Sequence, residues 1–208
     1  MVEIFSFLEL EQKLPFFKGI NSRKVKTFFM IDKDKTFNTI IDFITGKETP
    51  EIGSEANRQK VERLLVADKG FAKRDIEVDA DIEIVVGGEV YRSQIDLVAT
   101  VEEKRFMVIK CVAASLGSWE REILSAARLL DRYQIPLAVV SDGKTAIVLD
   151  TLGGKKVGEG LGAIPSKDEA KKVLDTLTLS PLPEKRREQE KIIFRSYDSM
   201  NVNVRRNL

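Results

Sequence analysis

Two neighbouring apolar stretches, joined by the charged residues 102–104, constrain the fold of this chain more than any other feature. Each is typical of a buried β-strand, and each carries one ionisable side chain, Asp96 in the first and Lys110 in the second. Burying a charge is costly unless an opposite charge or a hydrogen bond compensates for it. Because alternate side chains of adjacent strands point to the same face of a sheet, Asp96 and Lys110 can converge on one face. The sequence therefore predicts an acid and a lysine that meet inside a β-sheet.

The elements predicted around this pair describe an α/β fold. A helix is expected over residues 54–69, three antiparallel strands between residues 76 and 113, a helix over residues 118–133, and two further strands between residues 137 and 149. The second helix would cross over from the third strand to the fourth and make those two strands parallel. The glycine-rich residues 153–162 predict a loop or hairpin, because their spacing fits neither nucleotide-binding pattern. We expect a mixed β-sheet with flanking helices.

The length of the chain fits one domain with an extension at each end. The 208 residues, 43% of them hydrophobic, suffice for a single sizeable core. Residues 1–50 are predicted to be an N-terminal extension packed on the core, with a helix over residues 36–45. The core domain is expected to span residues 51–182, and residues 183–208 to form a charged C-terminal helix and tail.

The composition excludes several kinds of site. The chain has no histidine and one cysteine, so a histidine-based triad and a structural zinc site are ruled out. Any metal would be a hard ion bound by oxygen atoms. A single cysteine fits the reducing cytoplasm, and no apolar run approaches the roughly 20 residues that span a bilayer. We therefore expect a cytoplasmic protein without a membrane partner.

Three segments of the sequence resemble the PD-(D/E)xK nuclease superfamily. They are an opening helix with an acid and a terminal glycine–aromatic pair (residues 55–71), a strand with an aspartate (residues 92–98) and a strand with a lysine (residues 106–112). More narrowly, they resemble the N-terminal nuclease domain of type I restriction enzyme R subunits. The resemblance implies a restriction-endonuclease-like core of order αβββαβ with helical extensions at both ends. It also implies Mg²⁺-dependent hydrolysis of DNA, with Mn²⁺ as a substitute, a metal ligand at Asp96 and a catalytic lysine at Lys110.

The sequence departs from the family pattern at one position of the site. The pattern has an acid two residues before the lysine, where this chain has Val108, and valine cannot bind a metal. The remaining candidates for metal ligands beside Asp96 are the carboxylate of Glu55, the backbone carbonyl of Ile109, and a carboxylate that has migrated to the following helix, from Glu120 or Glu122.

These observations leave three hypotheses about function. The first is a Mg²⁺-dependent DNA endonuclease. The second is a catalytically degenerate nuclease fold that binds nucleic acid or a protein partner without cleavage, and a purely structural module is a third alternative. The net charge of +1 gives no global signature of DNA binding, so contacts would come from local arginines, for which the candidates are Arg58, Arg92, Arg186 and Arg187. DNA is the expected partner, with a second copy of the chain or other restriction or repair subunits as further candidates.

Overall fold

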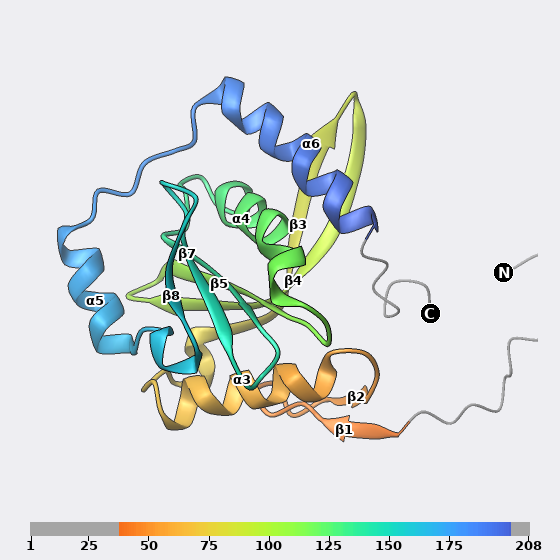
Figure 1. Ribbon diagram of the computed structural model, residues 1–208, viewed down its shortest axis with the longest axis vertical. Helices are drawn as coiled ribbons and strands as arrows, with labels where there is room; N and C mark the ends of the chain where they lie inside the picture. The colour runs from red at the N-terminus through yellow and green to blue at the C-terminus, as the bar shows by residue number, and fades with distance from the viewer. Residues whose placement is uncertain (1–37, 201–208) are drawn as a thin grey trace, which may run out of the picture. The chain divides into compact units, whose positions relative to one another are not determined.

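The computed structural model describes residues 38–200, and its centre is a six-stranded mixed sheet (Figure 1). The strands lie in the order β3-β4-β5-β6-β7-β8, so neighbours in the sheet are also neighbours in the sequence. All pairs are antiparallel except β5 and β6, which are parallel because helix α4 (Glu120–Leu129) connects them. The predicted mixed sheet and its crossover helix are therefore confirmed. The strands are β3 (Ile76–Val86), β4 (Glu89–Val101), β5 (Lys104–Cys111), β6 (Leu137–Ser141), β7 (Ala146–Asp150) and β8 (Lys155–Glu159).

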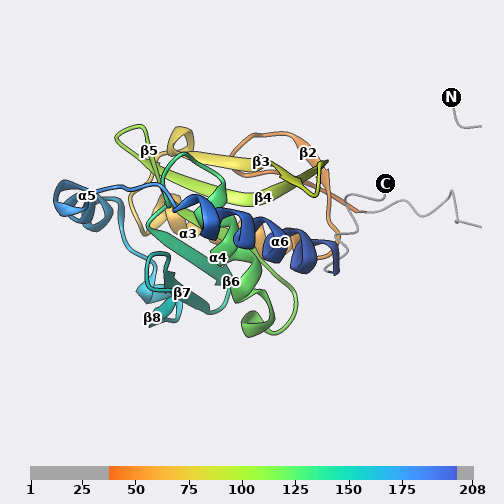
Figure 2. The ribbon, with the colours of Figure 1, turned by 90° about the horizontal axis from the view of Figure 1, so that it is seen from above.

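Helices cover both faces of the sheet. Ile109 of β5 belongs to a first hydrophobic core, together with α3 (Glu55–Ala67) and α5 (Lys167–Thr176), whereas Val108 belongs to a second core with α4 and α6 (Glu184–Met200). Successive residues of a strand point to opposite faces, so the two cores lie on opposite sides of β5. In Figure 2, α6 lies beside α4, and the two helices contact each other. Glycine-rich residues 153–162 include the end of the turn and the second strand of the β7–β8 hairpin, so the predicted loop or hairpin is confirmed.

The β3–β4 hairpin has a corner at Asp79. This residue has a left-handed backbone (φ 53°), which is unusual for a residue other than glycine. Before the corner Ile76 packs into the first core, and after it Ala80 and Ile82 pack into the second core. The far end of the hairpin then reaches α6, where the Tyr91 hydroxyl donates to the carboxylate of Asp198 over 2.5 Å (Figure 1).

One predicted element is wrong. The helix expected over residues 36–45 is, within the described residues, an antiparallel hairpin of β1 (Thr39–Ile41) and β2 (Glu48–Pro50). β-Branched residues favour the strand, and the Asp42 carboxylate accepts from the backbone N–H groups of Ile44 and Thr45, which fixes the turn. The rest of the predicted N-terminal extension, residues 1–37, lies outside the described residues. Within residues 38–200, no helix has the length and apolar character needed to cross a membrane.

Candidate functional site

Asp96 and Lys110 meet on the second-core face of the sheet, together with Glu122 of α4. The β4–β5 ladder pairs Leu97 with Ile109, and one step further along the same register Asp96 lies opposite Lys110. The Lys110 ammonium is 3.2 Å from Oε1 of Glu122 and 3.9 Å from Oδ1 of Asp96. The other oxygen of Asp96 accepts from the backbone N–H of Cys111 over 2.7 Å. The predicted acid–lysine pair therefore exists, and a second carboxylate joins it.

This trio of Asp96, Lys110 and Glu122, called here the lysine cluster, is almost fully buried. The exposed fractions are 6% for Asp96, 4% for Lys110 and 1% for Glu122. The ring of Trp119 lies 5.4 Å from the Lys110 ammonium, within the range of a cation–π interaction. Both carboxylates of the cluster contact the Lys110 ammonium, and carboxylate oxygens are ligands of the kind that a hard cation prefers.

The local sequence explains why the second carboxylate comes from α4. Val108 lies on the same face as Lys110, two residues earlier on β5, and is fully buried in the second core. It therefore provides packing at the position where the family pattern has an acid. Of the two acids in the first turn of α4, Glu122 is the one whose carboxylate contacts Lys110.

Glu55, a predicted metal ligand, and Arg58, a predicted DNA contact, form an ion pair with each other. The Arg58 guanidinium is 2.7 Å from Glu55, 2.7 Å from Asp42 and 2.9 Å from Glu62, and Arg58 is only 2% exposed. Gln59 also donates to Glu55, over 3.1 Å. We call these side chains the arginine cluster. Arg58 would have to leave three carboxylates to contact a phosphate, so this placement favours a structural role for it.

Glu62 was not singled out in the sequence, although it lies four residues after Arg58 and so shares its helix face. Burial raises the pKa of Glu62 to about 7, against a smaller lowering by the charge of Arg58. Its Oε1 atom accepts from the Arg58 guanidinium over 2.9 Å. A protonated Glu62 reduces the negative charge of the arginine cluster.

Asp79 is a second residue that the sequence did not reveal. The pairs Val78–Leu97 and Ala80–Ile95 place it directly across from Asp96. Burial raises the pKa of Asp79, the charge of Arg58 lowers it, and the charge of Asp96 raises it further. Asp79 is therefore a neighbour of Asp96 across the ladder, and the charge of Arg58 in the arginine cluster also acts on it. Strand alternation assigns its position to the solvent-facing side, so the sequence pattern gave no signal.

The other predicted DNA contacts lie on the β3–β4 hairpin and on α6. Arg92 is exposed and pairs with Glu83 over 2.8 Å. Arg186 is exposed and lies 3.9 Å from Glu190, whereas Arg187 is half-buried and donates to the carbonyl of Leu129 over 3.4 Å. A contact of these arginines with DNA phosphates stays a prediction.

The ligand atoms near Lys110 are oxygens, which hard divalent cations prefer. The candidates are the carboxylates of Asp96 and Glu122 and the backbone carbonyl of Ile109, which follows Val108 on β5. Among residues 38–200, no three aspartate, glutamate or cysteine side chains are grouped as a metal site. Mg²⁺ commonly uses one or two carboxylates and keeps several water molecules, so a two-carboxylate site remains compatible with it.

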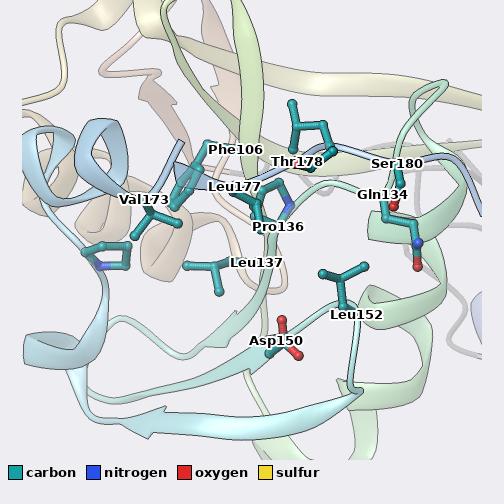
Figure 3. Close-up of a pocket in the computed structure, with 12 residues that line it drawn as sticks. Phe106, Gln134, Pro136, Leu137, Asp150, Leu152, Val173, Leu177, Thr178 and Ser180 are labelled. Carbon is teal, nitrogen blue, oxygen red and sulfur yellow. The ribbon is translucent and has the colours of Figure 1, made fainter. Parts of the chain in front are cut away.

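A separate pocket lies at the other end of the parallel strands (Figure 3). It has a volume of about 170 Å³, and its lining is mostly apolar. Leu137 at the start of β6 contributes to it, whereas Lys110 pairs with Val140 near the end of that strand. The pocket is therefore distinct from the lysine cluster.

Comparison with known proteins identifies one family. Residues 53–165, more than half of the chain, match the family described as type I restriction enzyme R protein N terminus (HSDR_N). No curated protein and no solved structure matches the chain. The matched segment runs from the residues before α3 to those after β8, so it includes Asp79 and both buried clusters except Asp42, and it leaves out α5 and α6.

Proposed function

The chain belongs to the type I restriction enzyme R protein N-terminus family, and on this premise we propose that it is a metal-dependent DNA endonuclease. The observation that carries the proposal is the contact between Lys110 and Glu122, 3.2 Å long, beside Asp96. Strand β5 has Val108 at the position where the family pattern has an acid. The Glu122 carboxylate of α4 lies near Lys110 of the same strand. Two carboxylates beside a lysine are the kinds of side chain that metal-dependent phosphodiester hydrolysis uses, and this supports the proposal.

Each residue of the lysine cluster has a distinct role in this proposal. Asp96 and Glu122 would hold Mg²⁺, with the carbonyl of Ile109 as a further ligand. The bound ion supplies a water molecule of lowered pKa and neutralises charge on the phosphate. Lys110 would orient the attacking water or stabilise the charge that develops on the phosphate oxygens. Its ammonium lies 3.2 Å from Glu122 and 3.9 Å from Asp96, so it is next to the place where the ion would be held.

Access to Lys110 requires movement of the segment before α4. Trp119 ends a short 3₁₀ turn, Leu116–Trp119, and its ring lies over the Lys110 ammonium. Residues 113–115, which precede this turn, are exposed. We infer that the segment shifts when DNA binds. Trp119 is the only tryptophan of the chain, so its fluorescence reports on this place alone.

The proposal is tested by nicking of supercoiled plasmid and branched DNA. Wild type is expected to nick DNA in Mg²⁺ or Mn²⁺ and not in a chelator. Asp96→Asn and Lys110→Met are each expected to reduce the rate to that of the chelated reaction. Thermal unfolding of each variant establishes that it is folded. Equal cutting by wild type and both folded variants would show that the activity comes from a contaminant and would overturn the proposal.

The near-complete burial of the lysine cluster favours the alternative of a binding protein that does not cleave. DNA retardation at several salt concentrations separates the two functions. Retention of DNA without nicking, with an affinity that falls steeply as salt rises, would support the alternative. The family makes DNA, and other subunits of a restriction enzyme, the partners to test first.

A further inference from the structure

Helix α6 lies beyond the residues that match the family, yet it is built into the second core. Phe194 on α6 is fully buried there, and its ring meets Tyr91 of β4 edge to face, with centroids 6.4 Å apart. Figures 1 and 2 show α6 beside both the β3–β4 hairpin and α4. The helix therefore contacts the element that carries Glu122.

A buried polar network joins α6 to α4. Glu190 of α6 accepts from the Ser125 hydroxyl over 2.7 Å and from the Arg128 guanidinium over 2.6 Å. Arg128 also donates to the carbonyl of Thr151 over 3.1 and 2.9 Å. All four residues are buried. A buried, charge-assisted network of this kind fixes geometry strongly, because moving either partner leaves a charge without compensation.

The first turn of α4 begins without a side-chain cap. The residue before the helix is Trp119. Glu122 lies in this first turn, and Ser125 follows it by three residues, so the two side chains project from neighbouring positions on the helix surface. Ser125, which donates to Glu190, is therefore about one helical turn from Glu122, whose carboxylate contacts Lys110.

We propose that Glu190 is a positioning residue, which holds α4 through Ser125 and Arg128 so that the Glu122 carboxylate reaches Lys110. This inference rests on the proposed function, because it concerns the metal-binding competence of the same lysine cluster. It assigns α6 a part in the site although α6 touches none of the reacting groups. A purely structural role predicts lost stability alone, whereas a positioning role also predicts weaker metal binding.

The test compares Glu190→Gln and Ser125→Ala with Tyr91→Phe in the full chain. Tyr91→Phe is the matched control, because it removes a hydrogen bond between α6 and the β3–β4 hairpin and leaves α4 untouched. Mn²⁺ is titrated while Trp119 fluorescence is recorded, and the Mn²⁺ dependence of nicking and the thermal unfolding are measured alongside. Glu190→Gln is expected to raise the half-saturating Mn²⁺ concentration by up to about 10-fold, the lower end of the effect of losing a group bonded to a metal ligand itself, because Glu190 acts on Glu122 only through the helix. Ser125→Ala should shift it less, in the same direction, and Tyr91→Phe should not shift it.

The outcomes separate this inference from the proposed function. A wild type that binds Mn²⁺ and nicks DNA, with folded Glu190→Gln and Ser125→Ala variants of unchanged half-saturation, would overturn the positioning role alone. A wild type that neither binds Mn²⁺ nor nicks DNA would overturn both. If Glu190→Gln does not fold, Ser125→Ala decides, because it keeps the ion pair between Glu190 and Arg128.

Discussion

Glu122→Gln is expected to slow metal-dependent nicking of DNA by about 10²- to 10³-fold, the usual effect of removing one preorganised electrostatic group from an active site. Glutamine keeps the size of the side chain and one oxygen acceptor. It removes the negative charge that would hold the cation and that compensates Lys110 at 3.2 Å. The rate is measured on supercoiled plasmid over a range of Mg²⁺ concentrations.

A surface substitution and an unfolding measurement serve as controls for Glu122→Gln. Glu159→Gln removes an exposed acid of β8 that pairs with Lys156, and it should leave the nicking rate unchanged. Thermal unfolding separates lost chemistry from lost structure. A folded Glu122→Gln variant with the rate of wild type would contradict the role of this carboxylate.

Glu62→Gln is expected to raise the free energy of unfolding at pH 8 by about 2–3 kcal/mol. The pKa of Glu62 is about 7 in the folded chain, against an ordinary value of 4.5, so the folded state holds the proton more tightly than the unfolded state does. Below pH 4.5 both states are protonated, and Glu62 imposes no penalty. As the pH rises from 4.5 to 7, stability falls, and above pH 7 the loss is constant.

The pH dependence provides the internal control for Glu62→Gln. Urea unfolding of wild type and variant should give similar free energies at pH 4 and values that diverge steadily up to pH 7. Glutamine carries no charge at any of these pH values, so it avoids the cost of burying the charged Glu62 carboxylate beside Arg58, which already pairs with Asp42 and Glu55. A difference between the two proteins that is the same at pH 4 and pH 8 would contradict a raised pKa.

The sheet and the pairing of Asp96 with Lys110 could be predicted from the sequence, because both depend on local patterns of apolar and charged residues. Asp96 and Lys110 each interrupt an apolar strand, and adjacent strands leave such residues few ways to be compensated. Glu122 was a candidate because the crossover helix must begin near the end of β5. Glu122 was the predicted ligand from this helix and Glu120 a further candidate, and which of them contacts Lys110 depends on how the helix is rotated against the sheet.

The features that the sequence did not reveal depend on tertiary contacts. Residues 36–45 have apolar spacing compatible with a helix, but the turn around Asp42 and Gly46 makes residues 38–50 a hairpin. Glu55 and Arg58 were assigned separate functions, although their spacing also allows the ion pair that forms. Asp79 has no distinguishing neighbours in the sequence, because its position follows from the corner in β3.

The acid that the family pattern has at position 108 is absent from this chain, and this absence relates the packing of α4 to the contact between Glu122 and Lys110. Val108 fills the second core at the point where the family pattern has a metal ligand, and Glu122 approaches Lys110 from the helix that packs on the same core. A carboxylate supplied by α4 depends on the placement of that helix, which in turn depends on α6. In this chain the packing of α4 would therefore set the position of the second metal-binding carboxylate. In the family pattern that carboxylate lies on the same strand as the lysine.

The nicking rate of the double variant Val108→Glu/Glu122→Gln, relative to Glu122→Gln alone, tests the central claim most directly. Position 108 lies on the face of Lys110, so a glutamate there returns the acid to β5 and gives Lys110 a carboxylate again. If Glu122 serves as the displaced metal ligand, the double variant should nick at least about tenfold faster than Glu122→Gln. A folded double variant that nicks no faster than Glu122→Gln would contradict the claim.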